Sequence, residues 1–468
     1  MRILIHGLNF APELVGVGKY TGEMAQWLAD RGHEVRVVTA PPFNPQWKVA
    51  DGFSSWRYAR EEYSGQPAAL KTEVRLPQPE VVLVGAGWHG PTERLTECAI
   101  QNFFSPTPRE LPIELQQNLG GAAGYLHVFR CPLYIPRHPS ATKRILHLAS
   151  FALSSFSAML RHAAWRPDVV LVLEPTLFCL PAAWLTARLC DAKTWLHVQD
   201  FEADAGFELG LVRSAILRRA VESIEKKLLC SFGAVSTISG KMLARLEQKG
   251  VPASTRHFFP NWVDTRVIFP LAHPSPLRAK LNIARGEVVA LYAGTMGHKQ
   301  GLAVLADAAT QSTGRANLRF VFCGEGPGKP ELLDRTAGLS NVDWMPMQPF
   351  DRLNDLLNLA DIHLLPQKAD AADLVMPSKL TGMFASGRPV VAAARPRTQL
   401  ADAVEGRGIA VGPGDAAEFS HAIEHLATDS RLRERLGKNA RDYALSELAK
   451  ERVLSRFEQE LCRFIAAR

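Results

Sequence analysis

Short apolar runs rich in β-branched residues alternate with helix-like segments along most of this chain. Near the N-terminus, a strand-like run at 3–6 precedes a helical pattern at 18–31 and a second strand-like run at 34–39. This order is typical of a βαβ unit, in which a helix connects two parallel strands. The alternation therefore predicts parallel sheets with helices packed on them.

The same alternation occurs in two successive series. The first continues with strand-like runs at 168–173, 194–198 and 234–237. The second begins at 288 and continues with runs at 319–323, 342–345, 362–365, 389–393 and 408–411. Two series of this kind predict an α/β protein with two doubly wound, Rossmann-like domains.

The proline-bearing stretch at 261–285 has weak periodicity and is the predicted link between the domains. We expect an N-terminal domain at 1–262, a C-terminal domain at 263–448 and a final helix at 449–468 that crosses back to the first domain. Residues 64–125 are rich in Pro, Gly, Gln and Glu and have a poor helical pattern. They are predicted to be an insertion in the first domain.

The composition is that of a globular protein with a large core. The 468 residues suffice for two or three domains of about 150 residues each. The 54 Lys and Arg exceed the 47 Asp and Glu by too little to indicate a nucleic-acid binder. The seven cysteines form no Cys-x-x-Cys pair, which favours reduced thiols in a cytosolic protein.

Neither an export signal nor a membrane-spanning helix is expected. The N-terminal MRILIHGLNF lacks a basic start and a small-residue cleavage site, so it is interpreted as a first strand. The longest nearly apolar stretch, Ile145 to Leu160, is interrupted by polar residues. It is also shorter than the ~20 residues that a spanning helix needs.

Glycines after the first strand suggest a ligand-binding loop. Gly16, Gly18 and Gly22 resemble a dinucleotide fingerprint, but that fingerprint starts directly after its strand, whereas here the segment after His6 intervenes. The second strand also ends at Thr39 without the acidic residue that would bind a ribose. The remaining interpretations are a flexible ligand loop at the carboxyl end of the strand, or a plain turn with glycines at the start of a helix.

A second glycine loop follows the first strand of the second series. It runs from Gly294 to Gly301 and contains Lys299, whose ammonium could neutralise a diphosphate. A solvated surface lysine is the alternative. The segments 324–327 and 373–382 also follow strands of this domain. Because the carboxyl ends of parallel strands meet at one edge, these segments together predict a binding site.

Motifs along most of the chain carry a family resemblance. They include APELVGVGKYTGEM at the first loop, HVQDFEAD from 197, FFPNWVD from 258, YAGTMGHKQG from 292 and PSKLTGMFASGRPVV from 377. In order and spacing the chain resembles the retaining family 4 glycosyltransferases of the GT-B fold, including those of colanic acid biosynthesis. Residues 64–125 fall outside the resemblance.

The resemblance implies transfer of a sugar from a nucleotide diphosphate sugar to an acceptor, with the donor in the C-terminal domain and the acceptor largely in the N-terminal one. By position it makes Gly16, His197 and Lys299 the catalytic candidates. The implied donor-binding residues are Gly294, Thr295, Lys299, Gly324, Glu325, Asp373, Pro377, Ser378, Lys379 and Leu380. For His197, a buried histidine that satisfies a core hydrogen bond is the alternative.

The sequence departs from the family pattern at two places. The paired glutamates of the family would fall at Leu374, beside Asp373, and at Gly382; the arginine that accompanies the lysine would fall near Thr295. Threonine does not replace an arginine on a diphosphate. We expect either that Ser378 and Lys379 take over donor binding, or that the protein is weakly active or only binds the donor.

The family's retaining reaction needs no paired catalytic carboxylates of the hydrolase kind, because the leaving diphosphate itself takes the acceptor proton. The chain has no Asp-x-Asp motif, so neither a metal ion nor any other cofactor is expected beside the sugar donor. GDP-fucose is the expected donor by analogy within the family. A sugar-nucleotide epimerase on the same fold is the second enzyme interpretation.

The stretch from Arg130 to Arg166 has six Arg or Lys and no Asp or Glu. Its apolar body with basic ends, including Arg144 and Arg161, is typical of an interfacial helix on anionic lipid; a buried helix with solvated ends is the alternative. With Gly18, these residues are the predicted acceptor or membrane contacts. The expected acceptor is a polyprenyl-diphosphate saccharide, and the expected location is cytoplasmic, peripheral on the inner face of the cytoplasmic membrane.

Overall fold

The structure is a computed structural model of the whole chain. It describes residues 1–13, 16–44, 46–64, 124–137, 140–174, 177–201, 204, 207, 214–297, 300–315, 317–368 and 377–467. Nearly all of the predicted insertion lies outside these residues. So do two predicted site residues, Lys299 and Asp373, together with Leu374. By internal contacts the chain divides into two compact units, residues 1–172 with 178–193, and 173–177 with 194–468.

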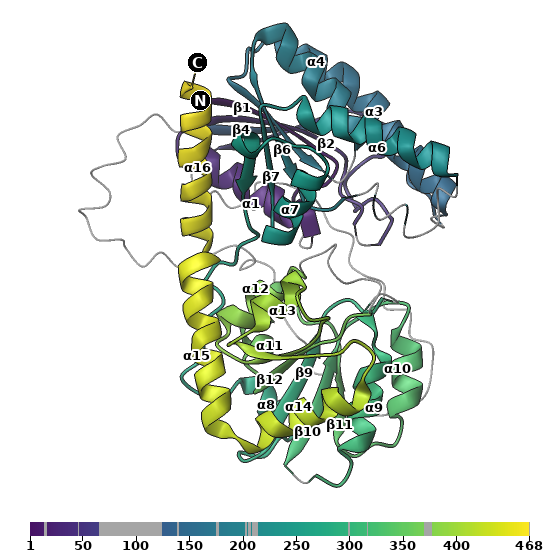
Figure 1. The fold of residues 1–468 in the computed structure, drawn as a ribbon, viewed down its shortest axis with the longest axis vertical. Coiled ribbons are helices and arrows are strands. Elements are labelled where there is room, and N and C mark those ends of the chain that lie inside the picture. The colour runs from purple at the N-terminus through teal and green to yellow at the C-terminus, as the bar shows by residue number, and fades with distance from the viewer. Residues whose placement is uncertain are drawn as a thin grey trace, which may run out of the picture. The chain divides into compact units, whose positions relative to one another are not determined.

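The first sheet has eight strands in the order β3-β4-β2-β1-β5-β6-β7-β8 (Figure 1). They are β1 Arg2–Gly7, β2 Glu34–Thr39, β3 Ala59–Ser64, β4 Tyr125–Arg130, β5 Val169–Glu174, β6 Lys193–Val198, β7 Ala234–Thr237 and β8 Arg256–Phe258. Strand β3 is antiparallel to β4, whereas β2 is parallel to both β1 and β4, and β7 to both β6 and β8. Three strands of this sheet were not predicted, namely the antiparallel edge strand β3 and the parallel strands β4 and β8.

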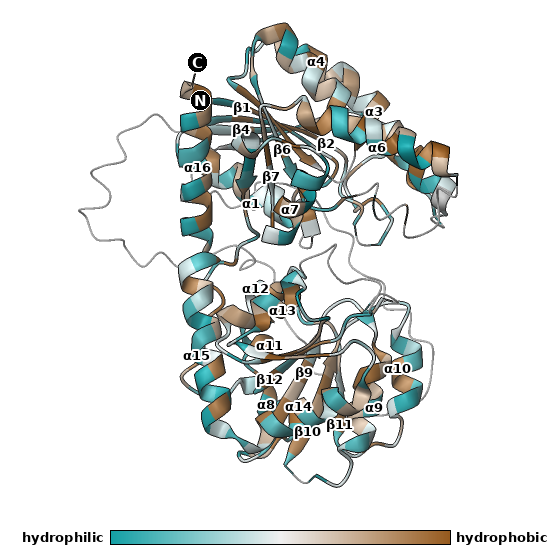
Figure 2. Ribbon diagram, in the orientation of Figure 1, coloured by the Kyte–Doolittle hydropathy of each residue, from teal (hydrophilic) through white to brown (hydrophobic). Residues whose placement is uncertain are grey.

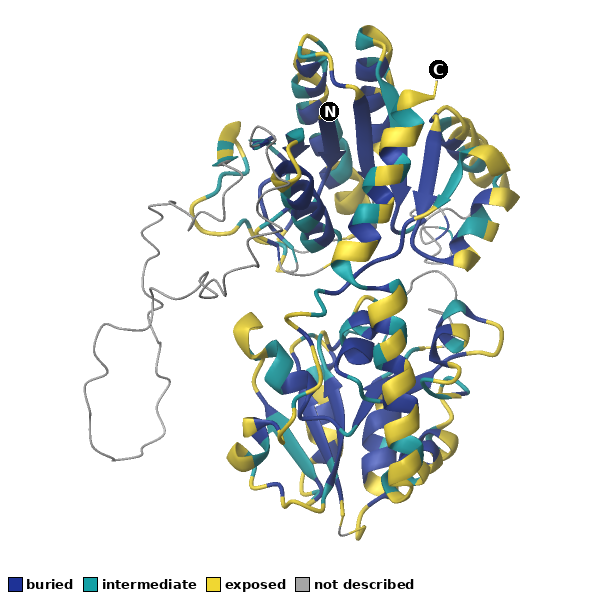
Figure 3. Ribbon diagram, turned by 90° about the vertical axis from the view of Figure 1, so that its left-hand side faces the viewer, coloured by how far each residue is buried: buried dark blue, intermediate teal, exposed yellow. Residues whose placement is uncertain are grey.

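The second sheet has six parallel strands in the order β11-β10-β9-β12-β13-β14. They are β9 Val288–Ala293, β10 Leu318–Cys323, β11 Val342–Met345, β12 Ile362–Leu365, β13 Val390–Ala393 and β14 Gly408–Val411. All six lie within two residues of the runs predicted from sequence. These strands are mostly buried and hydrophobic because helices pack on both faces (Figures 2 and 3).

Helices follow most of these strands, and several bury apolar side chains against the sheets. The helices are α1 Gly16–Asp30, α3 Ala141–Ala163, α4 Leu180–Cys190, α6 Ala215–Cys230, α7 Gly240–Gln248, α8 Pro276–Lys280, α9 Ala303–Gln311, α10 Lys329–Thr336, α11 Leu353–Leu357, α12 Lys379–Ala385, α13 Gln399–Val404, α14 Ala416–Thr428, α15 Ser430–Glu447 and α16 Lys450–Ala466. Of these, α3, α4 and α6 also expose large apolar residues such as Leu153, Leu189 and Ile216. Several helices begin at a serine, threonine or aspartate whose side chain accepts a backbone N–H, as at Ser239 and Asp415.

The strand order of each sheet reverses at one strand. In the first sheet β1 lies between β2 and β5, and in the second β9 lies between β10 and β12. Ligands of open α/β sheets bind at the carboxyl ends of strands where the order reverses. The segment 8–16 follows β1 and the segment 294–301 follows β9, so both predicted glycine loops lie at such a point.

The last helix, α16, packs on the second half of the first sheet. The rings of Phe457 and Phe464 lie 5.3 and 5.4 Å from that of Trp195 in β6, both nearly perpendicular to it. Val263 pairs with Ala449 as an isolated parallel bridge just before α16 begins. Aromatic packing thus holds the end of the chain against a strand about 260 residues earlier in the sequence, and the main-chain bridge fixes the residue before α16.

Candidate functional site

The loops after β9 and β10 are joined by their main chains. Gly294 N donates to Cys323 O, Met296 N to Glu325 O, and Gly328 N to Met296 O, each at 2.8 Å. This close approach requires glycine, since a Cβ on Gly324 would lie 2.1 Å from the carbonyl oxygen of Gly294. The two glycine segments predicted as parts of one site therefore form one continuous backbone surface.

Lys379 brings a cation to this surface from the start of α12. Its Nζ donates to the hydroxyl of Tyr292 at 3.2 Å and lies 4.6 Å from the centre of that ring. A Cβ on Gly294, where φ is +127°, would lie 2.7 Å from the same Nζ. Burial lowers the pKa of Lys379 to about 8. Among the described residues it has no carboxylate partner, so the ammonium is available to an anion at Gly294.

The other predicted donor residues divide into two groups. Thr295 is exposed beside Gly294, and its carbonyl accepts a hydrogen bond from the Tyr292 hydroxyl at 2.6 Å. Pro377 and Ser378 lie just before α12 and are partly or fully exposed. Leu380, by contrast, is 1% exposed and packs in the core beneath α12.

Glu325, another predicted donor-binding residue, already has a cationic partner in the protein. Its carboxylate is mostly exposed and forms an ion pair with Lys329 at 2.6 Å, one turn along the same segment. Gly382, where the second of the family's paired glutamates would fall, faces an apolar side chain, because a Cβ there would lie 3.3 Å from Leu357 Cδ1. The described part of this site thus joins Gly294, Thr295, Gly324 and Lys379.

The loop after β1 is organised around an acid that the sequence did not single out. Glu13 is buried, and its Oε1 accepts the backbone N–H groups of Phe43 and Asn44 at 3.0 Å, while its Oε2 accepts Asn9 Nδ2 at 2.9 Å. Burial raises the pKa of Glu13, although these hydrogen bonds and nearby Arg130 oppose the shift. Glu13 therefore ties the loop to the segment after β2.

The predicted glycines of this loop have different environments. Gly18 is buried against Glu13, since a Cβ there would lie 2.4 Å from Glu13 Oε2. Gly16 is exposed at the first position of α1 with φ of +61°. Gly18 thus has a packing role, whereas Gly16 remains open to a ligand. A single glutamate inside a glycine-rich segment was the available signal for Glu13.

His197 lies in a closed hydrogen-bond network at the end of β6. Gln199 Nε2 donates to His197 Nε2 at 2.9 Å, which leaves His197 Nδ1–H to donate to Ser236 Oγ at 2.9 Å. Trp195 Nε1 donates to the same hydroxyl. Burial lowers the pKa of His197 to about 3, so the ring is neutral. This geometry matches the alternative of a satisfied core histidine.

Two of the resembling motifs meet next to His197. Gln199 Nε2 also donates to Asn261 Oδ1 at 3.2 Å, and the ring of Phe259 lies 4.8 Å from that of His197. The strings HVQD and FFPNW are therefore in contact although they are separated by about 60 residues. The side-chain amide of Gln199 makes the hydrogen bond between them, and His197 adds the ring contact with Phe259.

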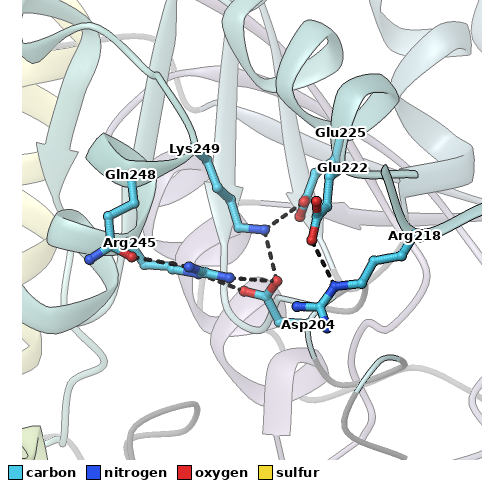
Figure 4. A network of polar contacts seen from close by, with 7 residues as sticks. All are labelled: Asp204, Arg218, Glu222, Glu225, Arg245, Gln248 and Lys249. Carbon is cyan, nitrogen blue, oxygen red and sulfur yellow. Dashed lines mark hydrogen bonds and ion pairs between the residues drawn. The ribbon is translucent and has the colours of Figure 1, made fainter. Parts of the chain in front are cut away.

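A buried ion network holds the chain just after this motif (Figure 4). Asp204 accepts from Arg245 and from Lys249, and Lys249 also binds Glu225. Burial would raise the pKa of Asp204, but the hydrogen bonds from Arg245 and Lys249 place it below its usual value. Burial raises the pKa of Glu225. Asp204 is thereby linked to α7 through Arg245, and to α6 through Lys249 and Glu225.

The helix predicted in the acid-free stretch is α3, and it is amphipathic. Phe151 is fully buried, whereas Leu153 is 78% exposed, and the exposed side also carries Ile145, Leu146 and Phe156. The exposed Arg144 lies over the ring of Trp47 at 5.5 Å. Across the described part of the chain, we find no helix with the length and apolarity to span a bilayer.

Family models match most of both halves of the chain. The model described as glycosyl transferases group 1 matches residues 287–429, and the model described as glycosyl transferase 4-like domain matches residues 104–262. The first contains all six strands of the second sheet, with Gly294 and Lys379. The second contains β6 with His197 and ends at the FFPNW motif.

A curated protein and several solved structures are similar over the whole length. The chain is 36% identical to the protein designated colanic acid biosynthesis glycosyl transferase WcaI of Escherichia coli, over 98% of this chain and 100% of that one. Sucrose-phosphate synthase from Thermosynechococcus elongatus has a TM-score of 0.67 at 16% identity, with 100% of both chains covered. HepE from Anabaena, in complex with UDP, has a TM-score of 0.63 at 14% identity, covering 99% and 100%. These likenesses confirm the predicted GT-B fold class.

Proposed function

Because this chain belongs to the glycosyltransferase family that includes WcaI and matches the group 1 and 4-like models, we propose a specific transfer reaction for it. It moves a sugar from a nucleotide diphosphate sugar to a lipid-linked saccharide, with retention of configuration, in assembly of a colanic-acid-like exopolysaccharide. GDP-fucose is the proposed donor.

The observation that carries this proposal is Lys379 against Gly294. A partly buried ammonium without a carboxylate is costly to the extent that it is desolvated, and an anion that joins it offsets this cost. Here it lies on a glycine surface at the carboxyl ends of β9 and β10, where phosphate groups of ligands bind in open α/β sheets. Lys379 thus supports the expectation that a lysine from α12 replaces the arginine absent at Thr295.

In the proposed reaction, cations and backbone amides stabilise charge as it develops on the leaving diphosphate. The bond from the sugar carbon to the diphosphate oxygen breaks, the acceptor oxygen forms the new bond on the same face, and the acceptor proton passes to the diphosphate. Lys379 holds the diphosphate, and Lys299 is proposed to do the same from the loop after β9. Gly16 is proposed to leave room for the acceptor.

The acceptor side is proposed to meet the cytoplasmic face of the membrane. The support is α3, whose exposed side carries Leu153 and other apolar side chains while its flanks are basic and free of acids. Such a helix binds anionic lipid surfaces by apolar insertion and charge. The proposed acceptor, a polyprenyl-diphosphate saccharide, would be reached at that surface.

The transfer itself is tested by incubating the protein with a panel of nucleotide sugars and a lipid-linked saccharide. Glycosylated lipid with the donor configuration retained supports the proposal; release of an epimerised donor would identify an epimerase, and donor binding without turnover a scaffold. Lys379→Ala should lose donor binding, whereas Lys438→Ala, at an exposed lysine of α15, should retain it. Full activity of Lys379→Ala would show that the diphosphate site lies elsewhere.

Membrane association is tested by sedimentation with vesicles of phosphatidylcholine, with and without phosphatidylglycerol. Binding to the anionic vesicles should weaken as salt is added. Leu153→Ser should lower it, whereas Leu445→Ser, at an exposed leucine of α15, should not. Absence of binding to anionic vesicles at low salt would contradict the proposal.

A further inference from the structure

A cavity of about 450 Å³ lies between α3 and one edge of the first sheet, and the proposed reaction does not use it. Its walls come from β2, from β3 and β4 with the residues beside them, and from the second half of α3. Four arginines line it, namely Arg36, Arg60, Arg130 and Arg161. A volume of this size is in the range of small-molecule sites.

Two of the four arginines are neutralised and two are not. Arg130 is paired with Glu61 at 2.8 Å, and Arg60 with Glu62 at 2.6 Å. Among the described residues neither Arg36 nor Arg161 has a carboxylate partner. The cavity therefore carries two uncompensated positive charges, one on β2 and one on α3.

Arg36 is fixed in place but only partly hydrogen-bonded. Its guanidinium lies 4.2 Å from the centre of the Trp165 ring, and Nη1 donates to His162 Nδ1 at 3.4 Å. Its Nε is buried and has no hydrogen-bond partner in the described structure. An unpaired donor on a charged group is costly, so the described protein groups compensate this guanidinium only in part.

No acidic side chain is among the described residues that line the cavity. Burial, with the positive charges of Arg36 and Arg60, lowers the pKa of His162 to about 4, so its ring is neutral. Phe129 and Tyr58 supply the remaining apolar wall, and the Tyr58 hydroxyl donates to Ser154 O of α3 at 2.9 Å. The cavity thus combines fixed guanidinium groups with an aromatic wall.

We propose that this cavity binds a phosphate group through Arg36 and Arg161. Guanidinium groups match phosphate oxygens in pairs of charge-assisted hydrogen bonds, which suits a ligand held between a strand and a helix. The phosphate can belong to a soluble phosphorylated compound or to a lipid headgroup whose chains lie along the exposed side of α3. In the lipid case the inference rests on the proposed membrane association.

Calorimetry with inorganic pyrophosphate on the full chain tests the soluble source. Binding at low salt should weaken roughly tenfold in Arg36→Gln and in Arg161→Gln, as expected when a charge-assisted contact is lost. Arg188→Gln, at an exposed arginine of α4, is the matched control and should bind like the parent. Because Arg161 is exposed, its variant keeps the test valid if Arg36→Gln folds poorly.

Pyrophosphate can also bind at Lys379, so the same titration on Lys379→Ala isolates the cavity.

Sedimentation with phosphatidylglycerol vesicles tests the lipid source with the same arginine variants. If the Arg36 and Arg161 variants lose pyrophosphate binding, the ligand is a soluble phosphorylated compound. If these variants lose only vesicle binding, the ligand is a lipid headgroup. If neither probe binds, or both bind the two variants as well as the parent, the proposal is wrong. Leu153→Ser separates the cases, since it should weaken vesicle binding and leave pyrophosphate binding intact.

Discussion

The loops after β1 and β9 occupy equivalent points of their sheets, yet opposite charges fill the space beside their glycines. In the first, Glu13 lies against Gly18; in the second, Lys379 lies against Gly294. The carboxylate of Glu13 accepts two backbone amides and one side-chain amide, whereas the ammonium of Lys379 is hydrogen-bonded to a phenol oxygen. A satisfied buried charge holds a loop, and an unsatisfied one is ready for a ligand.

Gly294→Ala is expected to have the largest effect on donor affinity, because it distorts the loop after β9. The new Cβ would lie 2.5 Å from Lys379 Cε, and φ of +127° is strained for alanine. We expect donor affinity to fall by about 100-fold or more, since a displaced charge contact and strain together cost about 3 kcal/mol. Titration with donor nucleotide sugar measures it.

Two glycine variants serve as controls for that experiment. Gly314→Ala has a positive φ of +87° but open space, so it tests backbone strain alone. Gly286→Ala has open space and no such φ, and should change nothing. Equal donor affinities in Gly294→Ala and Gly314→Ala would mean that contact with Lys379 is irrelevant to the site.

The pH dependence of donor binding should come next in size. With its pKa at about 8, Lys379 is cationic below that pH and becomes neutral above it. Donor affinity should thus be level below about pH 8 and fall roughly tenfold per pH unit above it, because the diphosphate favours the charged form. Affinities of the parent and of Lys379→Arg between about pH 7 and pH 9.5 test this, since arginine stays charged throughout. An equal decline in both would assign the titration to another group.

Glu13→Gln probes the satisfied charge and should affect stability rather than donor binding. The amide can keep its oxygen on the backbone N–H groups of Phe43 and Asn44, but its NH2 group then faces the donor Asn9 Nδ2. Unpaired buried donors cost about 1–3 kcal/mol. Urea denaturation should show this loss against Asp51→Asn, an exposed acid in the same unit. A loss of donor affinity without a loss of stability would place Glu13 in the ligand site instead.

Sequence periodicity predicted every strand of the second sheet, because those strands are buried on both faces and read as apolar runs. It missed β3, β4 and β8 of the first sheet. The alternating Arg60, Glu61 and Glu62 of β3 belong to an edge strand with half its side chains in water. Strand β4 alternates between buried and partly exposed residues, and β8 has only 3 residues. Motif position likewise led to Gly294 and Lys379. It did not lead to Glu13, Gln199 or the pairing state of Arg36, which depend on contacts between segments distant in sequence. Leu380 and Gly18 show the converse, since both lie in the motifs but have packing roles.

The smallest effect is expected from Thr295→Arg, which restores the arginine implied by the family. Thr295 is exposed beside Gly294, so the new side chain has room, but its charge would be screened by solvent. If Lys379 already supplies the second cation, donor affinity should rise only about twofold to fivefold, within the range of exposed ion pairs. The informative comparison is between Lys379→Ala alone and Lys379→Ala combined with Thr295→Arg. If the double variant recovers donor affinity, the arginine at 295 and Lys379 serve the same diphosphate. No recovery would mean that Lys379 acts from a position that an arginine at 295 cannot reach.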